Sequence, residues 1–265
     1  MNSSRLEYKF LVPLAQLDAV RAAVKPFVRL DKYSQSRRNN EYTIRSVYFD
    51  TPIMNCYDEK IDGIKIRKKY RIRGYNELNE DGIIFLEIKR KYRNFISKNR
   101  APLHNRDLEN LFESRDIDKY ILPFGPDGKA QKDAQRFLFH YFRLNLNPKI
   151  LIVYEREAYY DRFSDSVRLT FDKNLRSAPF TYHNKLTNGY QLKPAFKNHF
   201  ILELKFDHGL PLWAKHVIAR FSPSKLALSK YTICLDSNDM VSDKRIKIAP
   251  LHYNFHFGLN RKVMA

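Results

Sequence analysis

Apolar residues alternate with charged or polar residues along several short stretches of the chain. This period of two is typical of β-strands that bury one face. The clearest stretches are residues 43–49, 65–75, 150–160 and 166–172. Three more strand-like stretches contain the triplet Glu-apolar-Lys, at Glu7-Tyr8-Lys9, Glu87-Ile88-Lys89 and Glu203-Leu204-Lys205. The pair Asp62-Gly63, just before residue 65, favours a hairpin turn between strands.

Helical spacing of apolar residues occurs in three places. One helix is predicted after Pro13, a second over residues 130–144 and a third after Pro211. Many strands with few helices predict an α+β fold built on a mainly antiparallel sheet or barrel with helical additions. We expect one domain over residues 1–240, followed by a basic and aromatic tail over residues 241–265 that has no clear period.

The charge balance narrows the choice of partner. The chain of 265 residues carries 48 Lys and Arg against 29 Asp and Glu, a net charge of +19. Such a surplus predicts a polyanionic partner, either nucleic acid, an anionic membrane surface or a phosphate-rich small molecule. Cys56 and Cys234 are far apart and predict buried free thiols. The chain has neither an apolar run of membrane-spanning length nor an N-terminal signal region, so we expect a cytoplasmic protein.

The placement of the charges favours phosphate. In residues 65–75, strand alternation puts five consecutive cations on one face, namely Lys65, Arg67, Lys69, Arg71 and Arg73. An ordinary sheet with an ionic face in water would also give such a strand. The repeated Glu-x-Lys order favours an interior lining instead, because a solvated face needs no particular residue order. Phosphate chains would neutralise such a lining, and its glutamates would hold a hard cation such as Mg²⁺ or Mn²⁺.

Six segments together resemble a known family. They are residues 5–10, 42–51, 70–73, 85–90, 167–169 and 201–205, and the match runs in order from about Arg5 to Leu235. The resemblance is to the catalytic domain of the vacuolar transporter chaperone complex, a polyphosphate polymerase of the triphosphate tunnel metalloenzyme superfamily. It implies a closed antiparallel tunnel barrel of about eight strands with a few flanking helices. Arg5 stands where many tunnel enzymes have a first Glu, and this departure favours the polymerase branch.

The resemblance also assigns site residues. It implies catalytic phosphate contacts by Lys9, Arg71, Arg73, Lys89, Arg156 and Arg168. It implies further substrate contacts by Lys69, Lys205, Ser229 and Lys230. Glu203 matches the metal-binding glutamate, Glu87 is a weaker candidate for a second metal contact, and Glu7 is weaker still. The expected metal is Mn²⁺ or Mg²⁺.

The resulting hypothesis is transfer of the ATP γ-phosphoryl group to a growing polyphosphate chain. Two alternatives on the same barrel stay open, a triphosphatase that activates water and a non-catalytic polyphosphate-binding module. Specific nucleic-acid binding is disfavoured, because the cations alternate with core residues along strands and no known nucleic-acid motif is present. The eukaryotic complex subunits also carry a phosphate-sensing domain and membrane helices. We expect a separate membrane partner to supply such functions here.

Overall fold

The computed structural model describes residues 6–76, 78–93, 95–181, 186, 191–207 and 209–241. Of the predicted C-terminal tail, only Val241 is among them. The strands are β1 (Leu6–Pro13), β2 (Val28–Leu30), β3 (Tyr42–Asp50), β4 (Ile66–Tyr75), β5 (Ile83–Tyr92), β6 (Phe95–His104), β7 (Asn147–Asp161), β8 (Val167–Pro179), β9 (Lys193–Pro194), β10 (His199–Phe206) and β11 (Ser224–Lys225).

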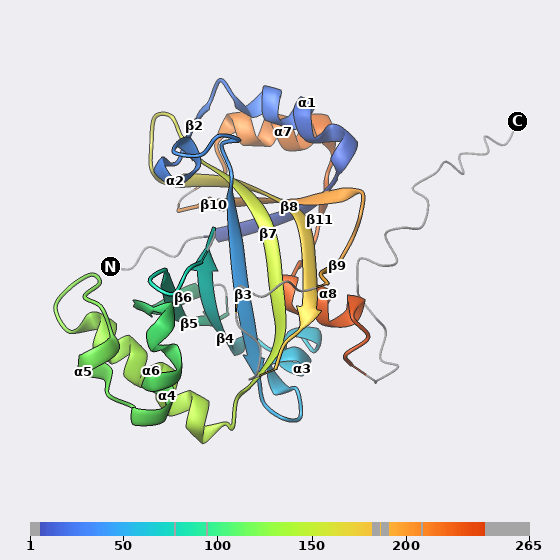
Figure 1. Cartoon of the computed structure of the whole chain (residues 1–265). Coiled ribbons are helices and arrows are strands. Elements are labelled where there is room, and N and C mark those ends of the chain that lie inside the picture. Colours follow the sequence, from blue (N-terminus) through green and yellow to red (C-terminus); the bar gives the residue numbers. More distant parts are fainter. Residues whose placement is uncertain are drawn as a thin grey trace, which may run out of the picture.

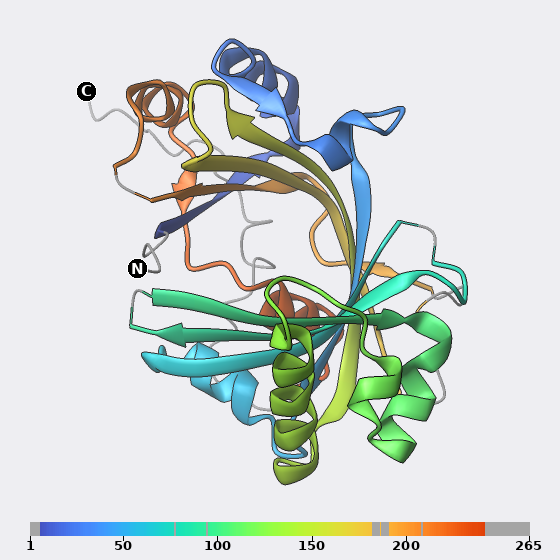
Figure 2. The same cartoon turned by 90° about the vertical axis from the view of Figure 1, so that its left-hand side faces the viewer.

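One antiparallel sheet contains all of these strands. Its order is β11-β1-β10-β8-β7-β3-β4-β5-β6, while β2 pairs with β7 and β9 pairs with β8. The long strands β3 and β7 curve, so the sheet folds back on itself (Figure 2). One layer contains β1, β8 and β10, and the facing layer contains β4, β5 and β6. The inner faces of the two layers therefore lie opposite each other.

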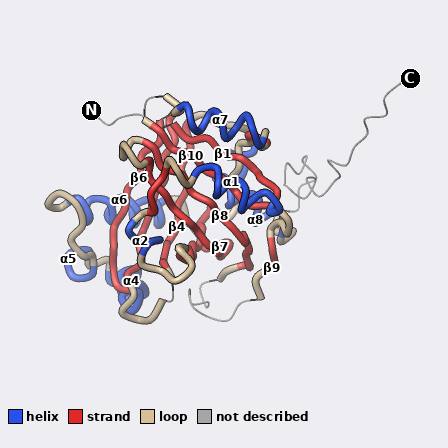
Figure 3. Tube along the Cα trace, turned by 90° about the horizontal axis from the view of Figure 1, so that it is seen from above, coloured by secondary structure: helices blue, strands red, loops and turns tan. Residues whose placement is uncertain are grey.

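Helices cover the outer faces of both layers (Figure 1). Two short 3₁₀ helices are η1 (Leu14–Gln16) and η2 (Asn105–Asp107). The α-helices are α1 (Leu17–Val24), α2 (Lys32–Gln35), α3 (Asn55–Ile61), α4 (Leu108–Ser114), α5 (Ile117–Tyr120), α6 (Lys129–Arg143), α7 (Leu212–Phe221) and α8 (Lys230–Ser237). Seen from above, α1 and α7 lie over β1 and β10 (Figure 3). In the described parts of the chain, none of the helices is long and apolar enough to cross a bilayer.

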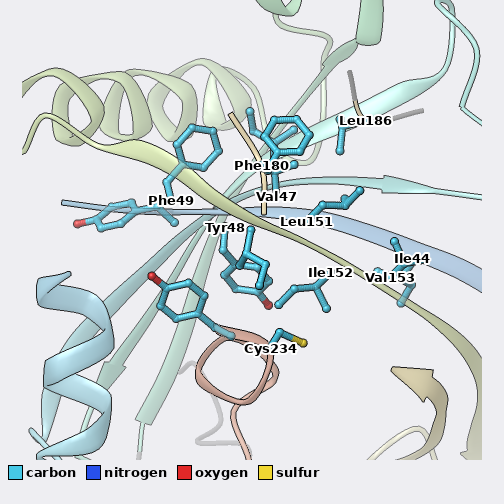
Figure 4. Packing of buried hydrophobic residues seen from close by; sticks show 14 of the residues in the cluster. Ile44, Val47, Tyr48, Phe49, Leu151, Ile152, Val153, Phe180, Leu186 and Cys234 are labelled. Carbon is cyan, nitrogen blue, oxygen red and sulfur yellow. The ribbon is translucent and has the colours of Figure 1, made fainter. Parts of the chain in front are cut away.

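Two hydrophobic clusters anchor the helices to the sheet. The larger cluster joins β3, β4, β5 and β7 to α3, α6 and α8, and its residues Val47, Phe49 and Leu151 pack together on β3 and β7 (Figure 4). The smaller cluster joins β1, β8 and β10 to α1 and α7. Because the apolar residues face outwards against helices, the charged residues on the alternate positions face inwards. Cys56 and Cys234 are buried free thiols, as predicted.

The predicted antiparallel α+β class is confirmed, and so are the three predicted helices. Closure of the sheet into a barrel by hydrogen bonds is not observed among the described residues, because β6 pairs only with β5 and the opposite edge ends at the two-residue strand β11. Side chains bridge the gap instead, including an ion pair of 3.2 Å between Lys89 and Glu7. The prediction of a hairpin at Asp62-Gly63 is wrong. These residues end helix α3, and Gly63 has a left-handed φ of 71°.

Candidate functional site: a cationic cavity between the two layers

A cavity of about 700 Å³ lies on the inner face of the bent sheet. Its wall contains twelve Lys and Arg side chains and two carboxylates, Glu7 and Glu203. The cations are Lys9, Lys60, Arg67, Lys69, Arg71, Arg73, Lys89, Lys91, Arg156, Lys205, Lys225 and Lys230. A wall with this charge favours anions inside the cavity, because like charges at such density repel one another.

Strand alternation explains how β4 supplies the wall. Arg67, Lys69, Arg71 and Arg73 line the cavity, whereas Tyr70 between them is buried in the outer core. The next strand, β5, places Lys89 and Lys91 beside these cations on the same face of the sheet.

Glu87 of β5 lies beneath this wall and is completely buried. The Nε of Arg71 lies 2.7 Å from the Oε2 of Glu87, and the Nζ of Lys98 lies 2.6 Å from its Oε1. Arg100 approaches the same Oε1 at 3.0 Å. Burial raises the pKa of Glu87, but Arg71, Arg73 and the other cations outweigh it and hold this pKa well below its usual value. Glu87 is therefore an anionic anchor for the cavity-lining arginines.

A second cluster joins β1 and β10. Lys9 lies directly opposite Glu203 in the sheet, and Glu7 lies opposite Lys205. Glu203 forms an ion pair with Lys205. Burial raises the pKa of Glu203, but Lys205 and Lys9 outweigh burial and keep this pKa well below its usual value. From the facing layer, Lys89 reaches Glu7 at 3.2 Å.

A third cluster joins β7, β8 and α8. Asp172 is completely buried and accepts hydrogen bonds from Arg156 at 2.5 and 2.7 Å. Lys230, the first residue of α8, lies 2.5 Å from the same carboxylate. Ser229 caps α8 and also accepts a hydrogen bond of 2.6 Å from Lys69 of β4. The helix start is thus tied to both layers of the sheet.

Ten of the twelve predicted site residues line this one cavity. Arg168 and Glu87 do not. Arg168 lies opposite Lys205 on the inner face of the sheet, but its guanidinium binds Asp31 at 3.0 Å and the Tyr42 hydroxyl at 3.2 Å. The roles assigned to these residues stay predictions.

Other wall residues were not among the predicted site residues. Lys60 comes from α3 and Lys225 from β11, and both lie in stretches that show no strand alternation to signal them. Arg67 and Lys91 could have been found, because each continues the inner-face alternation of a predicted strand. Tyr48 was also not predicted as a site residue, although its hydroxyl accepts a hydrogen bond of 2.8 Å from Arg71.

The donor set fits a hard divalent cation at Glu203 and Glu7. Within the described residues, no three Asp, Glu, His or Cys side chains converge as a self-sufficient metal site. Mg²⁺ is commonly held by one or two carboxylates together with phosphate oxygens of a substrate. The two cavity-lining carboxylates match that pattern, whereas Glu87 is enclosed by cations.

The family model described as the VTC domain matches residues 4–238, nearly the whole chain. The chain belongs to the VTC domain family. Membership supports a function of this VTC domain on polyphosphate or a triphosphate, within a tunnel-type site.

The solved structures that are similar to this chain include two proposed adenylate cyclases. A proposed adenylate cyclase of Bacillus halodurans is 14% identical, with a TM-score of 0.48, over 85% of this VTC domain chain and 95% of that protein. Another proposed adenylate cyclase, from Vibrio parahaemolyticus, is 11% identical, with a TM-score of 0.41, over 86% of this chain and 97% of that protein. No curated protein matches the chain.

Proposed function

We propose that this protein is a metal-dependent polyphosphate polymerase. It transfers the γ-phosphoryl group of ATP to the end of a growing polyphosphate chain. The observation that carries the proposal is the cavity wall, where twelve cations surround two carboxylates. A wall of this composition suits a substrate with many phosphates better than one with a single anionic group.

The reaction needs no general base. A terminal oxygen of the polyphosphate chain attacks the γ-phosphorus of ATP, the bond from that phosphorus to the β,γ-bridging oxygen breaks, and ADP leaves with the bond's electrons. The attacking oxygen is already ionised near neutral pH. Glu203 suits this scheme, because a carboxylate whose pKa lies well below its usual value is a weak base for activating water.

Catalysis then rests on alignment and charge neutralisation. Arg71 and Arg73 bind the phosphates from β4, and the buried Glu87 fixes the Arg71 guanidinium. Arg156 and Lys230 bind from the opposite side, and their shared contact with Asp172 fixes both side chains. A preorganised wall of this kind does not need to reorganise as charge shifts towards the leaving oxygen.

Glu203 and Glu7 would hold Mn²⁺ or Mg²⁺ together with phosphate oxygens of the nucleotide. Such an ion would neutralise charge on the reacting phosphates. The role of Glu203 is to supply one anionic ligand inside an otherwise cationic wall. Lys205 and Lys9 keep that carboxylate ionised.

The test is ATP turnover by the purified protein with Mn²⁺ or Mg²⁺, followed by electrophoresis of the products. We expect ADP together with a ladder of polyphosphates. Free phosphate without a ladder would replace the proposal with a triphosphatase. Tight binding of added polyphosphate without any turnover would replace it with a binding module.

A further inference from the structure

A second group of cations lies on the outer face of the sheet, behind the cavity wall. Lys68 of β4 stands between the cavity-lining Arg67 and Lys69, so strand alternation turns it away from the cavity. Arg90 of β5 lies directly opposite Lys68 and faces the same side of the sheet. The sheet itself therefore separates these two cations from the cavity.

Helix α6 packs against this outer face (Figure 2), and its last turn adds His140 and Arg143 to the two strand cations. The Nε2 of His140 lies 3.2 Å from the Nζ of Lys68. An ammonium group can only donate, so this Nε2 is the acceptor and the imidazole is neutral. Burial lowers the pKa of His140, and the three neighbouring cations lower it further. Lys68, Arg90, His140 and Arg143 therefore form one group, the outer cluster.

Acidic side chains do not neutralise the outer cluster. Among the described residues, none forms an ion pair with Lys68, Arg90 or Arg143, although Glu59 of α3 interacts electrostatically with Lys68. The Nε of Arg90 is buried, and within the same part of the chain it has no hydrogen-bond partner. Such a donor has lost its water without gaining an acceptor, which costs free energy. An anion at this place would supply the missing acceptor.

The dipole of α6 explains only part of the outer cluster. Basic residues in the last turn of a helix are stabilised by its partial negative charge, which accounts for His140 and Arg143. This effect is confined to the end of the helix, whereas Lys68 and Arg90 form a pair of like charges on neighbouring strands. Like charges directly opposite each other destabilise a sheet. A bound anion would offset this repulsion as well.

We propose that the outer cluster binds a single phosphate group, as inorganic phosphate or as the phosphate of a monoester. Its donors are an ammonium, two guanidinium groups and an imidazole, which come from two strands and a helix. Separate donors of this kind suit the several oxygens of a tetrahedral anion, whereas a carboxylate has only two oxygens to offer. The site does not depend on the proposed polymerase function, because the sheet separates it from the reacting phosphates.

The test is a calorimetric titration of inorganic phosphate into protein that already holds one equivalent of tripolyphosphate, which the more strongly cationic cavity takes up. The variant carries Lys68→Gln and Arg90→Gln. The matched control carries Lys132→Gln on α6 and Lys215→Gln on α7, two exposed lysines, so both proteins lose the same charge. We expect saturable phosphate binding in the original protein and in the control, and affinity weaker by about tenfold or more in the variant. Affinity for tripolyphosphate should change far less.

Nuclear magnetic resonance of the His140 ring shows where the ion binds. The spectrum of His140→Gln identifies the ring signals, and we expect them to shift with the same midpoint as the binding curve. A parallel titration with glycerol 2-phosphate distinguishes a monoester from the free ion as the preferred ligand. Sulfate, another tetrahedral dianion, should compete with phosphate for the site, whereas acetate should compete poorly.

Three outcomes would overturn the proposal. One is that neither phosphate nor the monoester binds saturably to the protein loaded with tripolyphosphate. Another is an equal loss of affinity in the variant and the control, because that would reflect net charge alone. The third is competition by acetate as strong as by sulfate. If the double variant does not fold, Arg143→Gln replaces it, since this exposed side chain lies at the end of α6 and its loss should also weaken phosphate binding.

Discussion

Arg71 and Glu87 lie directly opposite each other on β4 and β5, and two nitrogens of the guanidinium approach one carboxylate oxygen at 2.7 and 2.6 Å. Glu87 is completely buried, whereas Arg71 reaches the cavity wall. The pair thus joins the core of one layer to the surface that lines the cavity. Removing the acid would leave Arg71, Arg73, Lys98 and Arg100 without their common buried counter-charge.

The first prediction follows from this pair. Glu87→Gln should lower the free energy of unfolding by about 3 kcal/mol, because it leaves buried cations uncompensated. Thermal unfolding should show a lower melting temperature, and tripolyphosphate should recover more stability in the variant than in the original protein. An equal gain from tripolyphosphate in both proteins would argue against an electrostatic role for Glu87.

The same carboxylate also predicts a pH dependence of stability. The pKa of Glu87 in the folded protein lies well below its usual value. Its stabilising contribution is therefore complete above the ordinary glutamate pKa of about 4.3 and is lost as the pH falls below that value. Melting temperatures measured from neutral to acidic pH should fall less steeply in Glu87→Gln than in the original protein.

The second prediction concerns metal dependence. Glu203→Gln should abolish most Mn²⁺- or Mg²⁺-dependent turnover, because an amide is a poorer ligand for a hard divalent cation. Affinity for metal-free tripolyphosphate should stay the same or rise, since a negative charge has left the wall. The control is Glu155→Gln, which breaks an ion pair of 2.7 Å with Arg176 away from the cavity. Full metal-dependent turnover in Glu203→Gln would disprove the assignment.

Local patterns predicted most of the strands but not every element. Helix α8 escaped detection because it is buried on all sides, including Ile233, Cys234 and Leu235, so it shows no amphipathic period. Strand β6 carries Lys98 and Arg100 on its inner face and Pro102 near its end, which weakens the strand pattern. The resemblance implied a barrel closed by hydrogen bonds. Closure depends on the curvature of the whole sheet, which local sequence patterns do not show.

The site was predictable to the extent that strand alternation governs it. Lys69, Arg71 and Arg73 share a face in any straight strand, and the structure keeps them together. Pairing between distant segments is not visible in a single sequence. The ion pair of Arg168 with Asp31 spans 137 positions, and the cavity-lining residue Lys60 comes from a helix that showed no signal.

The third prediction concerns pH and Lys89. Burial lowers the pKa of Lys89 to about 8, a shift that Glu7 opposes and that Lys9 and Lys205 reinforce. The protonated form binds anions, so affinity for tripolyphosphate should weaken as the pH rises through 8. Binding should also draw in protons, because a bound anion raises the lysine pKa. Calorimetry in buffers of different ionisation enthalpy measures that uptake directly.

Lys89→Arg is the matched control, because guanidinium stays protonated over this range. It should flatten the pH dependence of binding and reduce proton uptake. Lys98, whose pKa burial lowers to about 7, would account for part of any uptake that remains near neutral pH. Identical pH profiles for Lys89→Arg and the original protein would contradict the prediction.

The fourth prediction concerns how α8 is held. Asp50, which is fully buried, accepts a hydrogen bond of 2.5 Å from the Tyr231 hydroxyl and further bonds from the backbone of Cys56 and Tyr57 at the start of α3. Tyr231 directly follows Lys230, so this contact positions the lysine that reaches into the cavity. Tyr231→Phe keeps the ring that stacks on Tyr48 but leaves one oxygen of Asp50 without its phenol donor.

Tyr231→Phe should therefore lower the free energy of unfolding by about 1–3 kcal/mol and raise the KM for ATP more than it lowers kcat. Denaturant unfolding and steady-state kinetics measure the two effects. Tyr159→Phe is the matched control, since it removes a hydroxyl that contacts Glu157 at 3.0 Å on the far side of β7. It should leave the KM unchanged. If both variants shift the KM equally, the change reflects general destabilisation, and Tyr231 does not position Lys230.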